Sequence, residues 1–160
     1  MLDLIFGLEE VDEVAVQVLD WVKHQQGQPR IPRPGPFAIS LSGPMGSGKT
    51  TLIRAMGKYL GCNPLPTSPT FSLIQTYMTA NGEQVVHADL FRLRNPQEWL
   101  ALDLEILVAG AEWLWVEWPE KAMDFMPEGM AHFELETCTG STPSANLTQQ
   151  RRLRFQGWAS

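Results

Sequence analysis

The sequence predicts an α/β fold in which a mixed β-sheet is flanked by helices. Two observations carry this prediction. A short apolar run at 37–41 leads into a glycine-rich turn, and a segment with apolar residues at helical spacing follows at 51–60. The chain has 160 residues, of which 44% are hydrophobic, which suits one globular domain. We therefore expect residues 1–160 to form a single unit.

The first helix is expected over residues 8–24, where apolar side chains recur at helical spacing. Acidic residues occupy its first turns, and Lys23 and His24 lie near its end, which suits the helix dipole. The segment 25–36 then contains four prolines and two glycines. Because proline lacks a backbone N–H and fixes its own φ, this segment is predicted to be a surface loop.

The apolar run at 37–41 is typical of a buried parallel strand, and a helix at 51–60 is expected after the turn. Residues 71–79 and 83–91 then look like two strands. Because only a short turn at 80–82 separates them, they are predicted to pair in antiparallel fashion.

Residues 96–108 have the spacing of an amphipathic helix, with a proline suited to its first turn. The apolar run at 113–116 predicts a strand that ends at an acidic residue. Alternating polar and apolar side chains predict a half-exposed strand at 132–136, and a last strand is expected at 151–155. The tail 156–160 is expected to be frayed.

A phosphate-binding pattern lies between the first predicted strand and the helix that follows it. The pattern G-x-x-x-x-G-K-S/T is matched in full by Gly43, Pro44, Met45, Gly46, Ser47, Gly48, Lys49 and Thr50. Glycines allow the backbone N–H groups to turn inward around an anion, and the helix adds its positive N-terminal end. Lys49 is the charge expected at the β- and γ-phosphates, and the Thr50 hydroxyl is a natural magnesium ligand.

Two carboxylates fall where such a protein needs them. Asp89 comes late in its predicted strand, and Glu117 ends the run at 113–116. One acid would hold Mg²⁺ and the other would orient water, and either residue fits either role. His87 alternates with Asp89, so the two are expected to share a face. A hydrogen-bonded structural histidine is the favoured interpretation of His87, and a catalytic or metal-binding role is the alternative. The sequence contains no Asn-Lys pair of the guanine-selecting motif, which favours ATP.

The charge and the ends of the chain narrow the function classes. A net charge of -6 argues against a protein that grips nucleic acid with its own basic surface. The N-terminus lacks the pattern of a signal peptide, and no apolar window has the length of a membrane span. We therefore expect a soluble cytoplasmic protein that does not bind membranes.

Four segments, taken in order, resemble the TsaE (YjeE) family, the P-loop ATPases of bacterial tRNA threonylcarbamoyladenosine biosynthesis. These are the loop GPMGSGKTT, which ends at Thr51, and the segments Ser68–Phe71, His87–Leu93 and Val116–Glu120. The resemblance covers roughly residues 8–155, and it implies a P-loop nucleoside triphosphate hydrolase fold with ATP bound at the loop.

The resemblance also implies roles for individual residues. Thr70 would be the switch threonine that approaches the γ-phosphate. Thr50 and Glu117 would hold Mg²⁺, and Asp89 would stand beside the metal. A basic residue of the last strand, Arg151 or Arg152, would reach the nucleotide.

The family acts with two partner subunits, TsaB and TsaD, which modify adenosine at position 37 of tRNAs that read ANN codons. The resemblance implies that this chain hydrolyses ATP to drive or reset that complex and meets tRNA only through it. Intrinsic activity is expected to be low and to rise when the partners are added. The chain departs from the family pattern at Pro44 and Met45, where an acid is lost, and at Phe91, where tyrosine is usual.

Two other functions share these motifs. A small-molecule or nucleotide kinase also has a P-loop and this size, but it needs an acceptor pocket and an arginine-bearing lid. The chain has one arginine cluster, at 151–154, and it falls in a predicted strand. A module that binds nucleotide without hydrolysing it is the second alternative.

Overall fold

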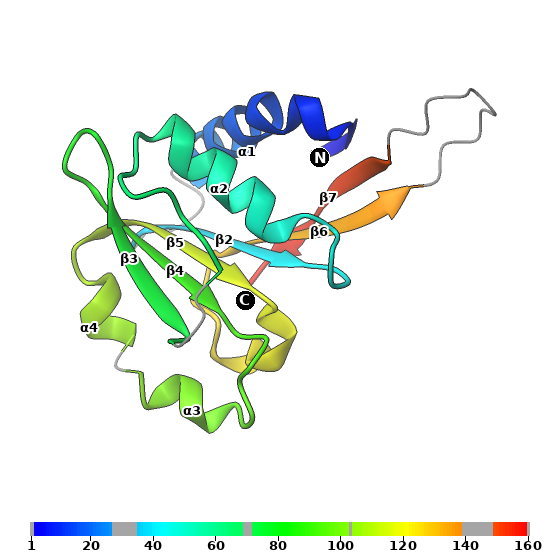
Figure 1. Cartoon of the computed structure of the whole chain (residues 1–160). Coiled ribbons are helices and arrows are strands. Elements are labelled where there is room, and N and C mark those ends of the chain that lie inside the picture. The colour runs from blue at the N-terminus through cyan, green and yellow to red at the C-terminus, as the bar shows by residue number, and fades with distance from the viewer. Residues whose placement is uncertain (1, 27–34, 69–71, 103, 139–148, 160) are drawn as a thin grey trace.

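The computed structural model describes residues 2–26, 35–68, 72–102, 104–138 and 149–159. The described residues form one mixed sheet in the order β1–β7–β6–β2–β5–β4–β3 (Figure 1). The strands are β1 (Asp3–Phe6), β2 (Phe37–Ser42), β3 (Ile74–Met78), β4 (Gln84–Asp89), β5 (Ala111–Glu117), β6 (Ala131–Cys138) and β7 (Gln150–Trp158).

Helices cover both faces of this sheet. In Figure 1, α1 (Val11–Gln26) and α2 (Lys49–Tyr59) lie on one face, and α3 (Gln97–Leu100) and α4 (Leu104–Val108) lie on the other. Short 3-10 turns complete the chain at η1 (Leu8–Glu10), η2 (Pro119–Lys121) and η3 (Met123–Phe125). The predicted mixed sheet with flanking helices is therefore confirmed.

The central strands run in the same direction. β2 pairs in parallel with both β5 and β6, and β4 pairs in parallel with β5. The outer pairs, β3 with β4, β6 with β7 and β1 with β7, are antiparallel. The predicted hairpin of β3 and β4 is thus confirmed. The carboxyl ends of β2, β4 and β5 meet at one edge, which is where ligands bind in open α/β sheets.

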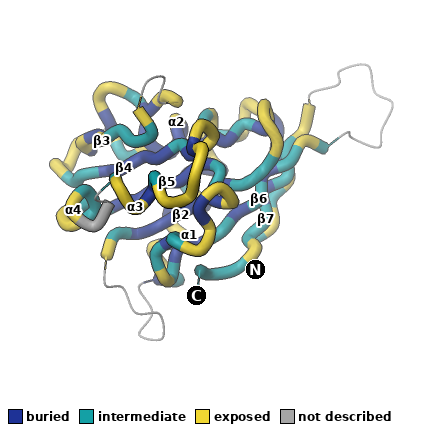
Figure 2. Tube along the Cα trace, turned by 90° about the horizontal axis from the view of Figure 1, so that it is seen from below, coloured by how far each residue is buried: buried dark blue, intermediate teal, exposed yellow. Residues whose placement is uncertain are grey.

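Alternating side chains of the central strands fill two cores. On β5, Trp113 and Trp115 pack beneath α1 and α2, whereas Leu114 and Val116 pack on the face of α3. Figure 2 shows buried residues concentrated along the central strands and exposed residues in the connections. Continuous burial of strands on both faces is typical of parallel sheets.

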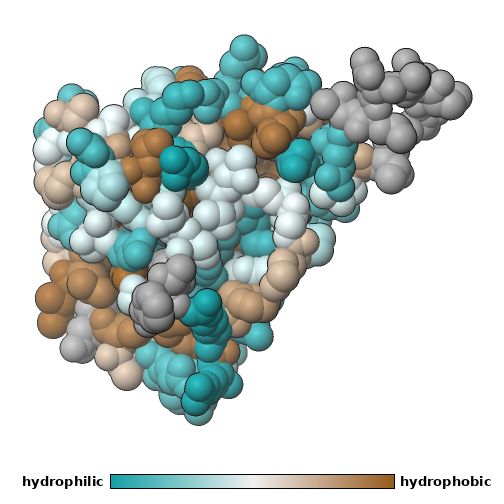
Figure 3. Space-filling view, viewed as in Figure 1, coloured by the Kyte–Doolittle hydropathy of each residue, from teal (hydrophilic) through white to brown (hydrophobic). Residues whose placement is uncertain are grey.

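The single helix predicted at 96–108 is wrong, because α3 and α4 are separate short helices. The N–H of Leu102 bonds to the carbonyl of Trp99, a tight turn that ends α3. Trp99 is buried and donates its indole N–H to the Phe125 carbonyl, which anchors α3 under the sheet. Apolar surface remains over α4 (Figure 3), where Ile106 is 76% exposed.

The two ends of the chain also differ from expectation. β1 was not predicted, because four residues carry too little periodicity to be recognised. Residues 156–158, expected to fray, continue β7, and Trp158 stacks on Trp21 with ring centroids 5.8 Å apart. The helix predicted at 8–24 begins as the turn η1 and continues as α1 to Gln26, inside the predicted loop 25–36. Residues 27–34 of that loop lie outside the described residues.

The helix predicted at 51–60 begins two residues earlier, at Lys49, so the end of the glycine-rich motif is helical.

Among the described residues, no helix combines the length and the apolar character that a membrane crossing requires.

Gly57 of α2 packs closely against Pro66, and this contact predicts the effect of a larger side chain at Gly57 on stability. A Cβ at Gly57 would lie 2.4 Å from Cδ of Pro66. Gly57→Ala gains up to about 1 kcal/mol of helix propensity, but this overlap costs roughly 1–3 kcal/mol. We expect lower stability in urea unfolding. Gly110→Ala is the control, because a Cβ there meets nothing within 4 Å. Equal stability of Gly57→Ala and the wild type would contradict this packing.

Candidate functional site

An open pocket of about 290 Å³ lies at the carboxyl ends of β2, β4 and β5. The loop after β2 forms one wall, and the ends of β4, β5 and β7 contribute the others. Its lining residues are Met45, Gly46, Gly48, Lys49, Thr50, Thr51, Ser68, Asp89, Phe91, Glu117, Trp118 and Arg151. Distant segments of the sequence therefore converge on the phosphate-binding motif.

Two glycines allow the loop to take its shape. Gly43 has φ 133°, and a Cβ there would lie 2.0 Å from the carbonyl oxygen of Leu135 in β6. Gly48 has φ 105° and precedes the first residue of α2. A side chain at either position would strain the backbone, and at Gly43 it would also overlap β6. The loop therefore lies tightly against β6 and leads into the N-terminus of α2.

Lys49 is bound to the loop itself. Its Nζ donates to the carbonyls of Gly43 and Pro44 at 2.7 and 2.9 Å. Burial lowers the pKa of Lys49 below its ordinary value, while three carboxylates, Glu117 most strongly, act in the opposite direction. The ammonium thus ties the N-terminus of α2 to the start of the loop.

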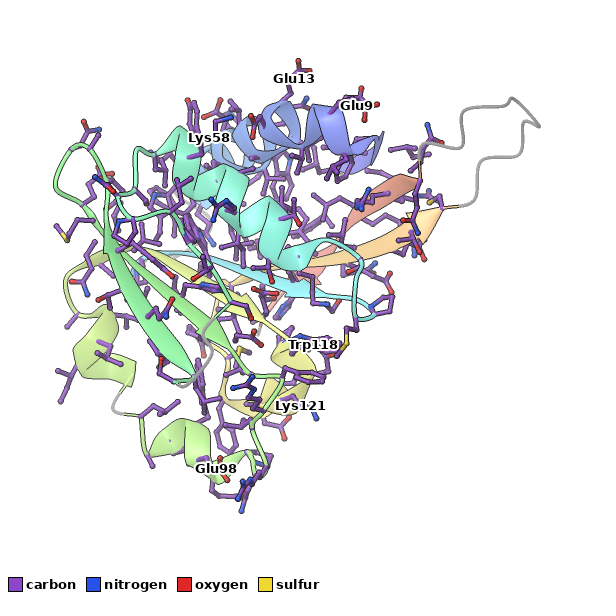
Figure 4. All side chains as sticks on the ribbon, in the orientation of Figure 1. Glu9, Glu13, Lys58, Glu98, Trp118 and Lys121 are labelled. Atoms are coloured by element: carbon purple, nitrogen blue, oxygen red, sulfur yellow. The ribbon has the colours of Figure 1, made fainter. Side chains whose placement is uncertain are left out.

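Trp118 covers this lysine. Nζ of Lys49 lies 3.8 Å from the centroid of the indole ring, a cation–π contact. Trp118 is the only described non-glycine residue with positive φ, at 59°, a conformation that costs about 1–2 kcal/mol. Figure 4 shows Trp118 between the end of β5 and the loop after β2. The ring of Phe91 packs against the indole of Trp118 with ring centroids 5.0 Å apart, so two aromatic side chains border the pocket.

Thr50 and Glu117 face each other in the pocket. The Thr50 hydroxyl donates within 3.0 and 2.9 Å of the two Glu117 carboxylate oxygens. Oε1 of Glu117 also lies 3.0 Å from Nε2 of His87. The expected structural hydrogen bond of His87 is therefore present, and its partner is one of the two predicted acids. His87 and Asp89 share a face, as the alternation predicted.

Asp89 ends β4 directly beside Glu117 in the strand register. Its carboxylate accepts from the Ser68 hydroxyl at 2.6 Å and from the Phe91 backbone N–H at 3.1 Å. Sequence reasoning had not assigned a role to Ser68, although it opens one of the quoted motif segments. Thr70, the expected switch threonine, lies outside the described residues.

The two candidate arginines lie on different sides of β7. Arg151 lines the pocket, and its Nε is buried without a hydrogen-bond partner among the described residues. Gly48 makes room for it, since a Cβ there would lie 3.0 Å from that nitrogen. Arg152 instead bonds Asp3 of β1 at 2.6 and 2.9 Å. Of the pair, Arg151 is the residue that the fold brings to the pocket.

The remaining motif residues contribute mainly through the backbone. Gly43 and Pro44 provide the carbonyls that hold Lys49, Met45 is exposed at the rim, and Ser47 is buried under the loop. Within the described part of the chain, no group of three or more His, Cys, Asp and Glu side chains could hold a metal by itself.

Comparison with known proteins assigns the family. The family model of the threonylcarbamoyl adenosine biosynthesis protein TsaE matches residues 7–146. The TsaE protein of Rickettsia bellii is 34% identical over 113 residues, which cover 70% of this chain and 77% of that protein. The TsaE protein of a Nostoc species is 43% identical over 93 residues, or 56% of each chain.

A solved structure agrees with the fold. The crystal structure of Bacillus subtilis YdiB superposes with a TM-score of 0.59 at 20% identity, covering 96% of this chain and 83% of that one. The resemblance seen in the sequence is therefore confirmed, and the chain belongs to the TsaE family of threonylcarbamoyl adenosine biosynthesis proteins.

Proposed function

We propose that this chain binds ATP with Mg²⁺ in the pocket and hydrolyses it as part of the machinery that makes threonylcarbamoyladenosine in tRNA. One observation carries the proposal. The fold gathers the phosphate loop, Lys49, Thr50, two carboxylates and Arg151 around a single pocket. These are the groups that phosphoryl transfer to water requires.

Lys49 and Arg151 supply the positive charge. Lys49 exchanges the carbonyls of Gly43 and Pro44 for the β- and γ-phosphates, which are stronger acceptors than neutral carbonyls. Nε of Arg151, which has no hydrogen-bond partner among the described residues, is a donor in a residue that lines the same pocket and is suited to an anionic ligand. The N-terminus of α2 adds backbone N–H groups aimed at the phosphates.

The oxygen donors of the pocket fit Mg²⁺. This ion prefers oxygen ligands and is held by one or two carboxylates together with substrate phosphates, rather than by an all-protein cage. The Thr50 hydroxyl and the Glu117 carboxylate, already in contact, provide such a partial set. When bound, Mg²⁺ neutralises charge on the phosphates. Asp89 stands beside Glu117 and is the group proposed to orient the attacking water.

We further propose that TsaB and TsaD are the partners and that the chain meets tRNA only through them. The biosynthetic name of its relatives supports the pathway. The net charge of -6 supports indirect contact, because binding to nucleic acid is dominated by basic side chains at phosphates. ATP hydrolysis by this chain then drives or resets the complex.

Phosphate release from ATP, measured with Mg²⁺ and without any acceptor, tests the proposed activity. A hydrolase releases phosphate slowly alone and faster when the two partner subunits are added. A small-molecule or nucleotide kinase stays nearly silent without its acceptor. Silence under both conditions, with ATP bound, would favour a non-catalytic nucleotide module.

Lys49→Ala should lower the rate of ATP hydrolysis by about 100- to 1,000-fold, because it removes one charged donor from the developing phosphate charge. Phosphate release measures the rate, and thermal unfolding checks that the variant is folded. Lys58→Ala is the matched control, since Lys58 lies on the same helix but pairs with Asp12 at the surface (Figure 4). Full turnover by folded Lys49→Ala would rule out this role.

Tryptophan emission should change when ATP and Mg²⁺ bind, because the Lys49 ammonium leaves the Trp118 ring for the phosphates. The chain has six tryptophans, so variants must identify the source of the signal. We expect Trp118→Phe to lose the change and Trp158→Phe, in β7, to keep it. The same emission change in Trp118→Phe as in the wild type would contradict the release of Lys49 from Trp118 as the source of the signal.

A further inference from the structure

We infer that His87 is a positioning residue that holds the Glu117 carboxylate in the orientation needed to bind the metal of a metal–nucleotide complex. The inference rests on the proposed function and adds a residue to it. His87 does not line the pocket, so it acts only through Glu117.

The contact between the two side chains is buried and direct. His87 is 0% exposed and Glu117 is 2% exposed, and Nε2 of the imidazole lies 3.0 Å from Oε1 of the carboxylate. A carboxylate without a proton can only accept, so Nε2 carries the hydrogen of this bond. The Thr50 hydroxyl lies within hydrogen-bond distance of both carboxylate oxygens and shares its one proton between them, and among the described residues Oε1 also accepts from Nε2 of His87.

Stability of the core does not account for a histidine at this position. Its register neighbour on β5 is Trp115, and the adjacent Val85 and Val86 of β4 are fully buried apolar side chains. Nδ1 of His87 has no hydrogen-bond partner among the described residues. A buried polar atom without a hydrogen-bond partner costs at least as much as one hydrogen bond typically contributes. The bond to Glu117 thus gives no net gain over an apolar residue.

The geometry explains what the histidine does. Glu117 ends β5 at the pocket, and without His87 the one hydrogen bond that would restrain its terminal carboxylate among the described residues is that of Thr50. Thr50 is itself a candidate metal ligand, so its hydroxyl is not a fixed support for Glu117. The fully buried side chain of His87 on β4 provides that support. Hydrogen-bond partners of metal ligands commonly change metal affinity or activity by about 10- to 100-fold when removed.

The test compares His87→Leu with His87→Gln in the full chain. Leucine fills the site without a donor, whereas the glutamine amide reaches as far as Nε2 and can still donate to Glu117. Mn²⁺ binding to the protein–ADP complex, followed by electron paramagnetic resonance, is the first readout. We expect His87→Leu to weaken Mn²⁺ binding by roughly 10- to 100-fold and His87→Gln to restore most of it.

Kinetics provide the second readout. In His87→Leu the kcat of ATP hydrolysis should fall, and the Mg²⁺ concentration for half-maximal rate should rise. The affinity for ATP measured without metal should stay at the wild-type value, because His87 touches neither the loop nor Lys49. If His87 only stabilised the fold, its loss would not raise the Mg²⁺ requirement selectively. A raised Mg²⁺ requirement together with wild-type affinity for metal-free ATP therefore indicates a positioning role.

His132→Gln is the matched control. His132 is a half-buried histidine of the same sheet that bonds Ser40 and lies outside the pocket lining. The His132→Gln variant should bind Mn²⁺ as tightly as the wild type. Thermal unfolding is measured for every variant. If His87→Leu does not fold, His87→Gln is compared with His87→Asn, whose amide is too short to reach Glu117 and should weaken Mn²⁺ binding.

Two results would overturn the inference. One is wild-type Mn²⁺ binding in folded His87→Leu or His87→Asn, and the other is equal loss in His87→Gln and the donor-free variant. Failure of the proposed function has a different signature in the wild-type chain itself, which would then either bind neither Mn²⁺–ADP nor ATP, or bind ATP without releasing phosphate.

Discussion

The parallel pairing of β2 with β5, and of β5 with β4, decides where each polar group of the site lies. Leu41, the last apolar residue before the phosphate loop, is level with Glu117, and Glu117 is level with Asp89. A shift of one residue in either register would send these carboxylates to the other face of the sheet. The central strand β5 is buried on both faces of the sheet. Its neighbouring residues Trp115 and Val116 are fully buried on opposite faces, so a shift would force each of them out of its core.

The same arrangement gives the pocket its internal contacts. Two of the groups proposed to meet the phosphates or the metal already have protein partners: Lys49 has two carbonyls and Trp118, and Thr50 has Glu117. At these two side chains the proposed ligand would exchange one partner for another. The exchange favours a ligand with strong anionic acceptors, since neutral carbonyls and an aromatic ring are weaker partners for an ammonium.

Sequence patterns predicted most of the fold and the core of the site. The glycine spacing of the loop and the apolar runs before Asp89 and Glu117 follow directly from backbone chemistry and strand burial. The choice between Arg151 and Arg152 could not be made, because it depends on which of these alternating side chains of β7 lies on the face of the sheet that carries the pocket. The break between α3 and α4 was also missed, since it reflects the anchoring of Trp99 to the Phe125 carbonyl, a tertiary contact. Contacts such as Ser68 with Asp89 join segments far apart and leave no local signal.

A crystal structure with Mg²⁺ and a non-hydrolysable ATP analogue tests the central claim most directly. The account predicts that the phosphates occupy the loop and that Nζ of Lys49 has left the carbonyls of Gly43 and Pro44 for them. It also predicts Mg²⁺ between the phosphates, Thr50 and Glu117. An analogue bound elsewhere, or phosphates in the loop with Lys49 still on those carbonyls, would contradict the account.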